Sequence, residues 1–193
     1  IKLGEGITQS MLRMNRQDNG NLEIYFEGIE GNICICDFFN DDNCKIEKII
    51  LSDNTEITDF TPYYTFKETS ENYTVPENSL IKDVYAQGSE NITLTGNSQD
   101  NRFIGNTGNN TYQGNGGNDY FYDEVGNDTY IYNLGDGWDT IQDQNGYDTI
   151  KIGEGVSLSD LRLSNQLNKN LEILFNNNDG NILIQDYFTN DSN

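Results

Sequence analysis

The chain has 193 residues, with 32 acidic side chains against 11 basic ones and a formal net charge of −21 at pH 7. A charge of this sign and size disfavours nucleic acid and anionic membrane surfaces as partners, and it favours divalent cations. Because the sequence contains no histidine, histidine-based catalytic triads and histidine-ligated zinc sites are excluded. Its 19 glycines and 2 prolines, with 34% hydrophobic residues, are typical of a β-rich, turn-rich protein.

No apolar run approaches the roughly 18 to 20 residues that a membrane-spanning helix needs. Ile1 is neither an initiator residue nor the start of a signal peptide, so we expect the sequence to be a piece of a longer protein.

The first forty residues, beginning IKLGEGITQS, are repeated from Ile150 onward at a constant offset of 149 residues without a gap. About half of the positions are identical. In the second copy we expect strands near Leu161–Leu163, at Leu171–Phe175 and at Asn181–Gln185, with a polar turn from Asn176 to Gly180 and an aromatic corner at Tyr187 and Phe188. Each copy is therefore predicted to form a small β-meander, and residues 45–60 are predicted to add a strand pair after the first.

Three cysteines occur only in the first copy, where Leu183, Gln185 and Asn193 stand in the second. An odd number predicts at least one free thiol or an intermolecular bond. Cys34 and Cys36 are two apart on one predicted strand, so a bond from either one to Cys44 suits the geometry better than a bond between them. A metal site built from these three cysteines is disfavoured.

Residues 61–79 contain both prolines, Pro62 and Pro76, and are predicted to be a connector and not a regular element. Its aromatic residues are expected to pack on a sheet. A carbohydrate-stacking role for Tyr63 and Tyr64 is the alternative.

A nine-residue pattern then runs through residues 80–151 and is clearest from Gly114 to Tyr122: Gly or Asn at positions 1 and 2, Gly at 4, Asp at 6 and a large apolar residue at 8. Position 8 reads Tyr85, Leu94, Phe103, Tyr112, Phe121, Tyr130, Ile141 and Ile150, with a two-residue slip near Tyr132 and Asn133. Position 6 reads Asp83, Ile92, Asn101, Asn110, Asp119, Asp128, Asp139 and Asp148, and position 4 is Gly in the later units.

Physically, the period means a Gly- and Asn-rich turn of six residues followed by a three-residue strand. Two units make one coil of a flattened parallel helix, so each position 6 lies about 4.8 Å from the position 6 two units later. Carboxylates stacked so closely repel one another unless a cation lies between them. Calcium suits the place because it accepts six to eight oxygens from carboxylates and backbone carbonyls. The position 8 side chains are expected to form the core.

The residues from about Leu94 to Lys151 strongly resemble the RTX, or haemolysin-type calcium-binding, repeat family. The resemblance implies that each ion is held by the carbonyls of positions 2 and 4 and the Asp of one turn, with the carbonyls of positions 1 and 3 and the Asp two units later. One site would then use Asn115, Gly117 and Asp119 with Leu134, Asp136 and Asp139. A second would use Glu124, Gly126 and Asp128 with Asp143, Asn145 and Asp148. Both span the slip, which places their aspartates 20 residues apart instead of 18.

Two further sites keep the spacing of 18 but depart from the pattern, because Asn101 would face Asp119 and Asn110 would face Asp128. The carbonyl positions of the first are Asn97, Gln99, Gly114 and Gly116, and those of the second are Asn106, Gly108, Asp123 and Val125. A neutral amide oxygen is a weaker ligand, Gln99 replaces the position 4 glycine, and Ile92 cannot bind a cation. The early coils, Asp83 to Ile104, are therefore expected to be held mostly by packing, and stacking without metal is the alternative for the units before Gly105.

The sequence thus predicts an all-β protein: a parallel β-roll at 80–151 flanked by β-meander accessory domains at 1–60 and, truncated, at 152–193. By resemblance, we expect a calcium-binding structural or binding module of a secreted bacterial protein that folds on calcium outside the cell, is not itself an enzyme and does not insert into membranes. Its partners would be calcium and neighbouring repeat domains of the same chain, or a glycan or cell surface. The alternatives are a polysaccharide-targeting module and a segment of an adhesin or toxin. Metal-bound ligand carboxylates should have pKa values below about 3.9, so that acid undoes the fold.

Overall fold

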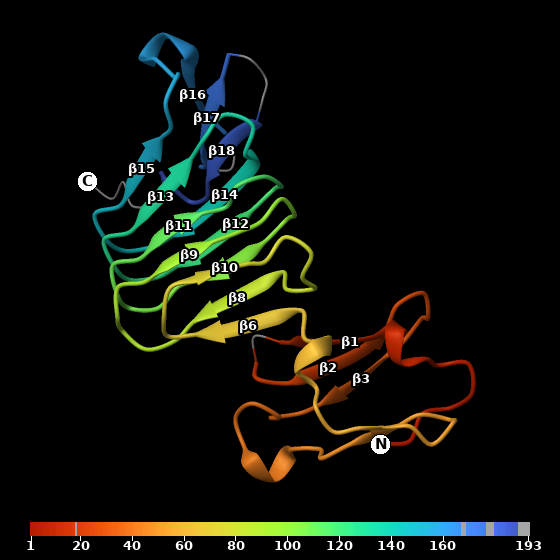
Figure 1. Ribbon diagram of the computed structural model, residues 1–193. Coiled ribbons are helices and arrows are strands. Elements are labelled where there is room, and N and C mark those ends of the chain that lie inside the picture. The colour runs from red at the N-terminus through yellow and green to blue at the C-terminus, as the bar shows by residue number, and fades with distance from the viewer. Residues whose placement is uncertain (18, 167–168, 177–179, 189–193) are drawn as a thin grey trace. The chain divides into compact units, whose positions relative to one another are not determined.

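A computed structural model describes residues 1–17, 19–166, 169–176 and 180–188. The chain divides into two compact units, Ile1–Phe66 and Lys67–Asn193. Every regular element in these described ranges is a β-strand or a short 3₁₀ helix, so the prediction of an all-β fold is confirmed (Figure 1). None of the described helices has the length and apolar character needed to cross a membrane.

The second unit is built from two sheets of stacked strands, in which successive strands from β6 to β15 alternate between the sheets (Figure 1). The larger sheet has the order β16 (Leu161–Asn165), β17 (Leu171–Phe175), β18 (Gly180–Ile184), β14 (Gly137–Asp143), β12 (Tyr120–Asp123), β10 (Arg102–Ile104), β8 (Asp83–Ala86) and β6 (Phe66–Thr69). The smaller sheet has the order β15 (Thr149–Ile152), β13 (Thr129–Tyr132), β11 (Thr111–Gln113), β9 (Thr93–Thr95) and β7 (Tyr73–Thr74). The predicted parallel stacking of the nonapeptide strands is therefore confirmed.

The strand register follows the repeat, and the slip does not disturb it. Phe103 lies beside Phe121, 18 residues later, whereas Phe121 lies beside Ile141, 20 residues later. The two extra residues fall in the turn between β13 and β14, where the Asp136 N–H donates to the Asn133 carbonyl at 3.1 Å and the Asn133 N–H donates to Asp136 Oδ2 at 2.7 Å. Because this turn is closed by its own hydrogen bonds, the extra length stays outside the sheets.

Side chains at position 8 form the core of the stack, as predicted, from Leu94 to Ile141. Phe103 and Tyr112 are fully buried, at 0% exposure. Rings two units apart stack on one another: the centroids of Phe103 and Phe121 are 5.4 Å apart, and those of Tyr112 and Tyr130 are 5.2 Å apart. Such offset aromatic pairs stabilise the stack beyond their buried area, by about 0.5 to 1.5 kcal/mol each.

Two expectations about the start of the stack are wrong. The register of the first coil is shifted by one residue, because Val84, and not Tyr85, lies beside Phe103. The Arg102 N–H donates to the Lys82 carbonyl at 2.8 Å, which fixes this shift and places the fully buried Val84 in the core. The segment 61–79 is not a connector without regular structure, since it supplies β6 and β7 to the two sheets.

The second sequence copy continues the larger sheet. Its three strands form the predicted antiparallel meander, and β18 then pairs in parallel with β14 from Gly180 beside Gly137 to Ile184 beside Ile141. The aromatic corner is present, with the rings of Tyr187 and Phe188 at 5.0 Å. Residues 177–179 of the predicted polar turn and Asn193 lie outside the described residues.

The first unit contains the other copy of the meander, formed by β1 (Leu12–Arg16), β2 (Leu22–Phe26) and β3 (Asn32–Ile35). The predicted strand pair that follows is also present, as β4 (Ile49–Ile50) and β5 (Glu56–Ile57). Three short 3₁₀ helices, η1 (Gln9–Met11), η2 (Asp42–Cys44) and η3 (Thr61–Tyr63), connect these strands. All three cysteines are free thiols, which agrees with the prediction of at least one.

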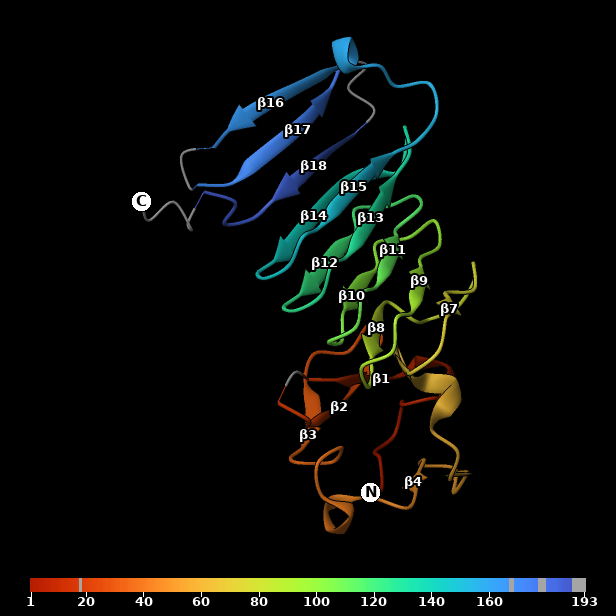
Figure 2. The same ribbon diagram turned by 90° about the vertical axis from the view of Figure 1, so that its left-hand side faces the viewer.

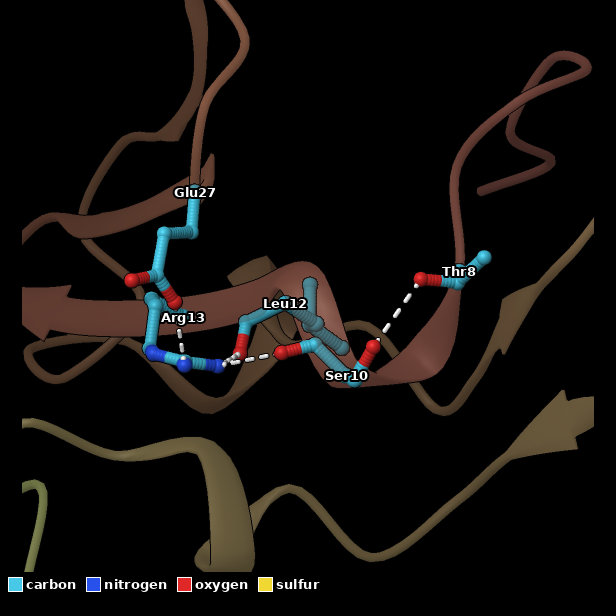
Figure 3. Close-up of polar contacts among 5 residues, drawn as sticks. All are labelled: Thr8, Ser10, Leu12, Arg13 and Glu27. Atoms are coloured by element: carbon cyan, nitrogen blue, oxygen red, sulfur yellow. Dashed lines mark hydrogen bonds and ion pairs between the residues drawn. The ribbon is translucent and has the colours of Figure 1, made fainter.

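The two copies also share a polar turn ahead of the first strand. In the first copy the Thr8 and Ser10 hydroxyls are 3.1 Å apart, and Arg13 donates to the Ser10 carbonyl at 2.8 Å while its other nitrogen pairs with Glu27 Oε2 at 2.5 Å (Figure 3). In the second copy, at η4 (Leu158–Asp160), the hydroxyls of Ser157 and Ser159 are 2.7 Å apart. The Asn176 amide, at the position of Glu27, donates directly to the Ser159 carbonyl at 2.9 Å. The two copies therefore share the hydroxyl pair and a side-chain donor to the carbonyl of its second member, as well as their sequence.

Candidate metal centre

Side chains at position 6 form two columns, one in the turns on each side of the stack. Each acidic member accepts the backbone N–H of the position 6 residue two units earlier through Oδ1. The distances are 2.7 Å from Asn101 N to Asp119, 3.0 Å from Asp119 N to Asp139, 2.7 Å from Asn110 N to Asp128 and 2.9 Å from Asp128 N to Asp148. The structure thus brings together every facing pair that the spacing placed two units apart, including the two pairs across the slip.

The second carboxylate oxygen of the buried aspartates has no hydrogen-bond donor. Asp119 Oδ2 and Asp128 Oδ2 are buried without a partner, and both residues are only 1% exposed. An unpaired buried polar atom costs about 1 to 3 kcal/mol, and more when it carries charge. These two oxygens are therefore placed to meet a cation or to hold a proton.

Burial raises the pKa values of these carboxyl groups far above the ordinary range for aspartate. The pKa of Asp119 rises to about 8, since burial and the neighbouring Asp139 carboxylate outweigh the stabilising N–H of Asn101. The pKa of Asp128 rises to about 7 and that of Asp139 to about 7, in both cases chiefly through burial. Without a bound cation, a large share of these groups would hold a proton near neutral pH.

The last coil carries a cluster of three carboxylates. Asp128, Asp143 and Asp148 each present an oxygen within 4.8 Å of the others, which is close enough for one ion to touch all three. Asp143 Oδ1 is a further buried atom without a hydrogen-bond partner, while Asp143 Oδ2 accepts the Tyr130 hydroxyl at 2.7 Å. Burial raises the pKa of Asp143 to about 6. The arrangement is an acidic cluster suited to a metal ion.

At two turn glycines, the nearest atom to an added Cβ is an oxygen. A Cβ at Gly126 would lie 2.6 Å from the Gly108 carbonyl oxygen and 2.7 Å from both carboxylate oxygens of Asp128. A Cβ at Gly114 would lie 2.1 Å from Asp119 Oδ2. Because carboxylate and carbonyl oxygens suit a hard cation, the residues present fit calcium.

Backbone carbonyls at position 4 point along each column. An ideal Cβ on Gly137 would come within 1.7 Å of the Gly117 oxygen, and one on Gly146 within 1.8 Å of the Gly126 oxygen. The predicted carbonyl ligands Gly117 and Gly126 are therefore directed at the turn two units later. Val125 and Leu134 lie on exposed turns, with 48% and 38% of their surfaces accessible.

Asparagines at several predicted ligand positions use their amide nitrogens on protein oxygens. Asn115 donates to the Gly96 carbonyl at 2.7 Å, and Asn145 donates to the Glu124 carbonyl at 3.0 Å. Asn106 donates to the carbonyls of Gln87 and Glu90, both at 3.1 Å. These contacts bind one coil to the previous one through side chains.

In the early coils, Asn101 and Asn110 carry amides where the next coil of each column has Asp119 and Asp128. Of these two amide nitrogens only that of Asn110 has a partner, since Asn101 Nδ2 is buried without one. Asn110 Nδ2 donates to the Gly108 carbonyl and to Asn106 Oδ1, each at 3.0 Å. Asn97 Nδ2 donates to the Pro76 carbonyl at 3.0 Å, and the Asn97 side-chain oxygen accepts the Gln99 N–H at 3.0 Å. The Asn110 amide thus places a donor, and not a ligand oxygen, against the Gly108 carbonyl. Gly116 was predicted as a carbonyl ligand together with Gly114. A Cβ added at Gly116 would meet only the Ser98 Cα, at 3.7 Å.

Sequence reasoning assigned Asp123 and Asp143 only through their backbone carbonyls and missed their side chains. Tyr112 donates to Asp123 Oδ2 at 2.5 Å, as Tyr130 does to Asp143, and burial raises the pKa of Asp123 and of both tyrosines. The signal was available: an aspartate ends one strand in each of two units 20 residues apart, and the position 8 residue of the preceding strand is a tyrosine in both cases, 11 residues before Asp123 and 13 before Asp143. A period-nine pattern that scored position 1 for acidic residues would have found them.

No protein-family model matches the chain, and no curated protein is significantly similar to it.

Proposed function

We propose that the later coils of the second unit bind calcium ions and that the chain is a calcium-binding repeat module of the RTX type. The observation that supports this most is the pair of buried, unpartnered oxygens, Asp119 Oδ2 and Asp128 Oδ2, in turns lined by oxygen. A divalent cation there neutralises the carboxylates and provides the partner that the protein lacks.

One ion would be held by Asp119 and Asp139 with the Gly117 carbonyl, and another by Asp128, Asp143 and Asp148. Asp128 accepts the Asn110 N–H and lies in the same cluster as Asp148. It therefore contributes both to the stacking of the coils and to the proposed metal site. Bound calcium would supply positive charge between stacked turns. The chain's own residues hold the coils in register through the ladder of N–H groups that reach each Oδ1.

The proposed role is that of a structural or binding scaffold in a secreted bacterial protein, with calcium-driven folding outside the cell. This follows from the resemblance of the repeats and from the acidic charge of −21, which opposes compaction until cations are bound. The buried carboxylates with raised pKa values supply the coupling between ion and fold, since each must lose its proton before it can bind the metal.

Calorimetric titration of the whole chain with calcium and, separately, with magnesium tests the proposal. We expect calcium to bind at several sites and magnesium to bind far more weakly, because magnesium requires a strict octahedron at about 2.0 to 2.1 Å and dehydrates reluctantly. Asp128→Asn should remove at least one site, whereas the control Asp53→Asn, at an exposed position of the first unit whose carboxylate accepts the Thr55 N–H at 2.9 Å, should titrate as the parent does. Equal binding of both metals, or equal loss in both variants, would contradict it.

A further inference from the structure

The two copies of the meander differ in how their inner faces are covered. In the first copy Leu12, Met14, Leu22 and Ile24 are all 0% exposed. In the second copy, 149 residues later, Leu171 is still buried at 9% exposure where Leu22 is buried. Leu163, however, is 69% exposed where Met14 is buried, and Tyr187 is 55% exposed where Phe38 is 5% exposed. The first copy therefore has a closed face, and the second has a face that is open at Leu163 and Tyr187.

The open face of the second copy borders a cavity of about 490 Å³. Its wall includes Leu163, Leu171, Ile173, Ile184 and Ile150, together with the acidic residues Asp143 and Asp148. The larger sheet continues beyond β14 through β18, β17 and β16, whereas the smaller sheet stops at β15 (Figure 2). These added strands are covered only in part, since Tyr132 of β13 stacks on Phe175 of β17 with their centroids 4.9 Å apart.

In the first copy, a segment of the chain itself covers this face. Ile49 at 0% exposure, Leu51 and Ile57 at 4%, and Phe60 at 8% belong to the same core cluster as Leu12 and Ile24. All of these covering residues come from the stretch that follows the first meander. Position 44 corresponds to position 193, so the 193 residues contain no second counterpart of this covering stretch.

The covering segment is also bound through backbone hydrogen bonds at two strand edges. The Leu3 N–H donates to the Ile50 carbonyl and the Ile50 N–H donates to the Ile1 carbonyl, both at 2.8 Å. At the other edge, the Thr65 N–H donates to the Met14 carbonyl at 2.8 Å, where Tyr64 forms a parallel bridge with Met14. The segment therefore forms two isolated parallel bridges, one between Ile50 and Lys2 and one between Tyr64 and Met14 of β1.

The second copy presents the same edge groups. The N–H groups of Thr149 and Gly153 donate to β13, at 2.8 Å in each case, so those of Ile150 and Ile152 point to the outer edge of β15. Ile152 corresponds to Leu3 and Ile150 to Ile1. β16 likewise forms the end of its sheet, and its Leu163 carbonyl corresponds to that of Met14.

One charged contact completes the match. In the first copy, Lys45 Nζ lies 4.7 Å from the Phe38 ring centroid and 5.7 Å from that of Phe39. The second copy keeps this aromatic pair as Tyr187 and Phe188. A lysine at the start of a covering segment would find the same two rings.

We propose that the open face of the second copy is a docking site for an extended apolar segment of the Lys45–Phe66 type. The segment pairs with the outer edges of β15 and β16, and it covers Leu163 and Ile173 with Ile, Leu and Phe side chains. This is strand addition with side-chain pockets, in which the backbone gives affinity and the pockets give specificity. None of these contacts involves a ligand of the proposed calcium sites, although Asp143 and Asp148 line the same cavity.

The test is the full chain extended after Asn193 by a second copy of residues 45–69, which reproduces the 149-residue offset. Amide hydrogen exchange is measured in calcium-containing buffer for the parent and the extended chain. We expect the Ile152 amide to exchange at least about tenfold more slowly in the extended chain, because it gains a carbonyl partner and cover. As a control, an extension with aspartate at the appended copies of Ile49, Leu51 and Ile57 should leave its exchange unchanged.

Leu163→Asp provides an independent test, because Leu163 is 69% exposed and its replacement should leave the parent chain folded. In the extended chain the same change should abolish the added protection at Ile152, since the equivalent Met14 is fully buried. The proposal is overturned if the extension leaves Ile152 exchange unchanged, if the control extension protects equally, or if Leu163→Asp has no effect on the extended chain. A parent chain that sediments as a dimer, with Ile152 already protected, would make a second copy the occupant and would also overturn it.

Discussion

The early and late coils of the stack share one backbone ladder but close it with different chemistry. Asn110 and Asp128 are stacked neighbours in the same column, and each is only 1% exposed. Asn110 satisfies its nitrogen on the Gly108 carbonyl at 3.0 Å, whereas Asp128 Oδ2 has no partner. The amide carries its own donor, and the carboxylate requires one from outside. In this column, the change from nitrogen to oxygen thus separates a self-contained turn from one that needs a cation, whereas in the other column the Asn101 amide nitrogen is itself without a partner.

The largest effect that separates the two regions should come from removing calcium. In excess chelator at neutral pH, amides of β12 to β15 should lose at least about a hundredfold of their exchange protection, and amides of β9 to β11 should lose much less. Each site held at 100 times its Kd in calcium contributes about 2.7 kcal/mol. Hydrogen exchange with and without chelator measures this. Equal loss in both regions would show that the whole stack depends on the ion.

The pH dependence of the protein's stability should have opposite signs with and without calcium. In the metal-free fold the pKa values of Asp119, Asp128 and Asp139 are about 8, 7 and 7, above the unfolded value near 3.9. A raised carboxyl pKa contributes stability that is present below about pH 4 and is lost as pH rises toward 8. Chelated protein should therefore melt at a lower temperature at pH 8 than at pH 5.

With calcium, the same rise in pH deprotonates the ligands and strengthens binding, so the melting temperature should hold or increase. Acid is thus expected to release calcium, as the sequence suggested. Protonation of Asp119, Asp128 and Asp139 nevertheless stabilises the metal-free fold. Thermal melts across pH in both buffers measure the reversal. Parallel pH profiles in the two buffers would rule out these carboxylates as the link between metal and fold.

An amide at position 128 and a carboxylate at position 110 should change stability in chelator in opposite directions. Asp128→Asn should raise the stability of the chelated protein by about 1 to 2 kcal/mol, because the new amide can donate where an oxygen was unpaired, and it should weaken calcium binding. Asn110→Asp should lower stability in chelator by about 1 to 3 kcal/mol, since it loses the bonds to Gly108 and Asn106. Denaturant unfolding in chelator gives both values, and changes of the same sign would contradict the comparison.

Truncation gives a related contrast. Asp128→Ala should weaken calcium binding more than Asn110→Ala, because only Asp128 belongs to the carboxylate cluster with Asp143 and Asp148. Paired calorimetric titrations measure the difference. Indistinguishable titrations would place the ion elsewhere.

The last comparison concerns the space that Gly114 leaves beside the Asp119 carboxylate. Gly114→Ala would put a methyl group against Asp119 Oδ2, where the ideal Cβ lies 2.1 Å from that oxygen. We expect weaker calcium binding and a loss of about 1 to 3 kcal/mol, as for other overpacked sites. Gly116→Ala is the matched control, because its nearest atom is 3.7 Å away. Calcium titration of both variants tests whether the ion binds in the space beside Asp119.

The repeat made the stack predictable, because a period of nine fixes both the position 8 core and the facing of Asn101 with Asp119 and of Asn110 with Asp128. The exceptions have physical causes. In the first coil the Lys82 carbonyl binds Arg102 and brings Val84 into the core, a choice between adjacent apolar residues that the pattern alone could not make. The strands β6 and β7 belong to no repeat, and the pairing that defines them involves residues far along the chain.

The site was predictable in its columns but not in its side-chain detail. Spacing could place Asp143 in the last coil, yet only packing shows its carboxylate within 4.8 Å of those of Asp128 and Asp148. Similarly, sequence treats Asn110 as a weak ligand, and the contacts show its nitrogen already committed to Gly108. The direction of a side-chain amide depends on neighbouring coils, and no local pattern encodes it.

The most direct test of the central claim is an anomalous diffraction map from crystals of the protein grown in calcium. The account predicts calcium peaks in the late coils, between Asp119 and Asp139 and at the cluster of Asp128, Asp143 and Asp148. It predicts none beside Asn110, where an amide nitrogen already fills the role. Peaks beside Asn110, or late coils without calcium at Asp119 and Asp128, would contradict it.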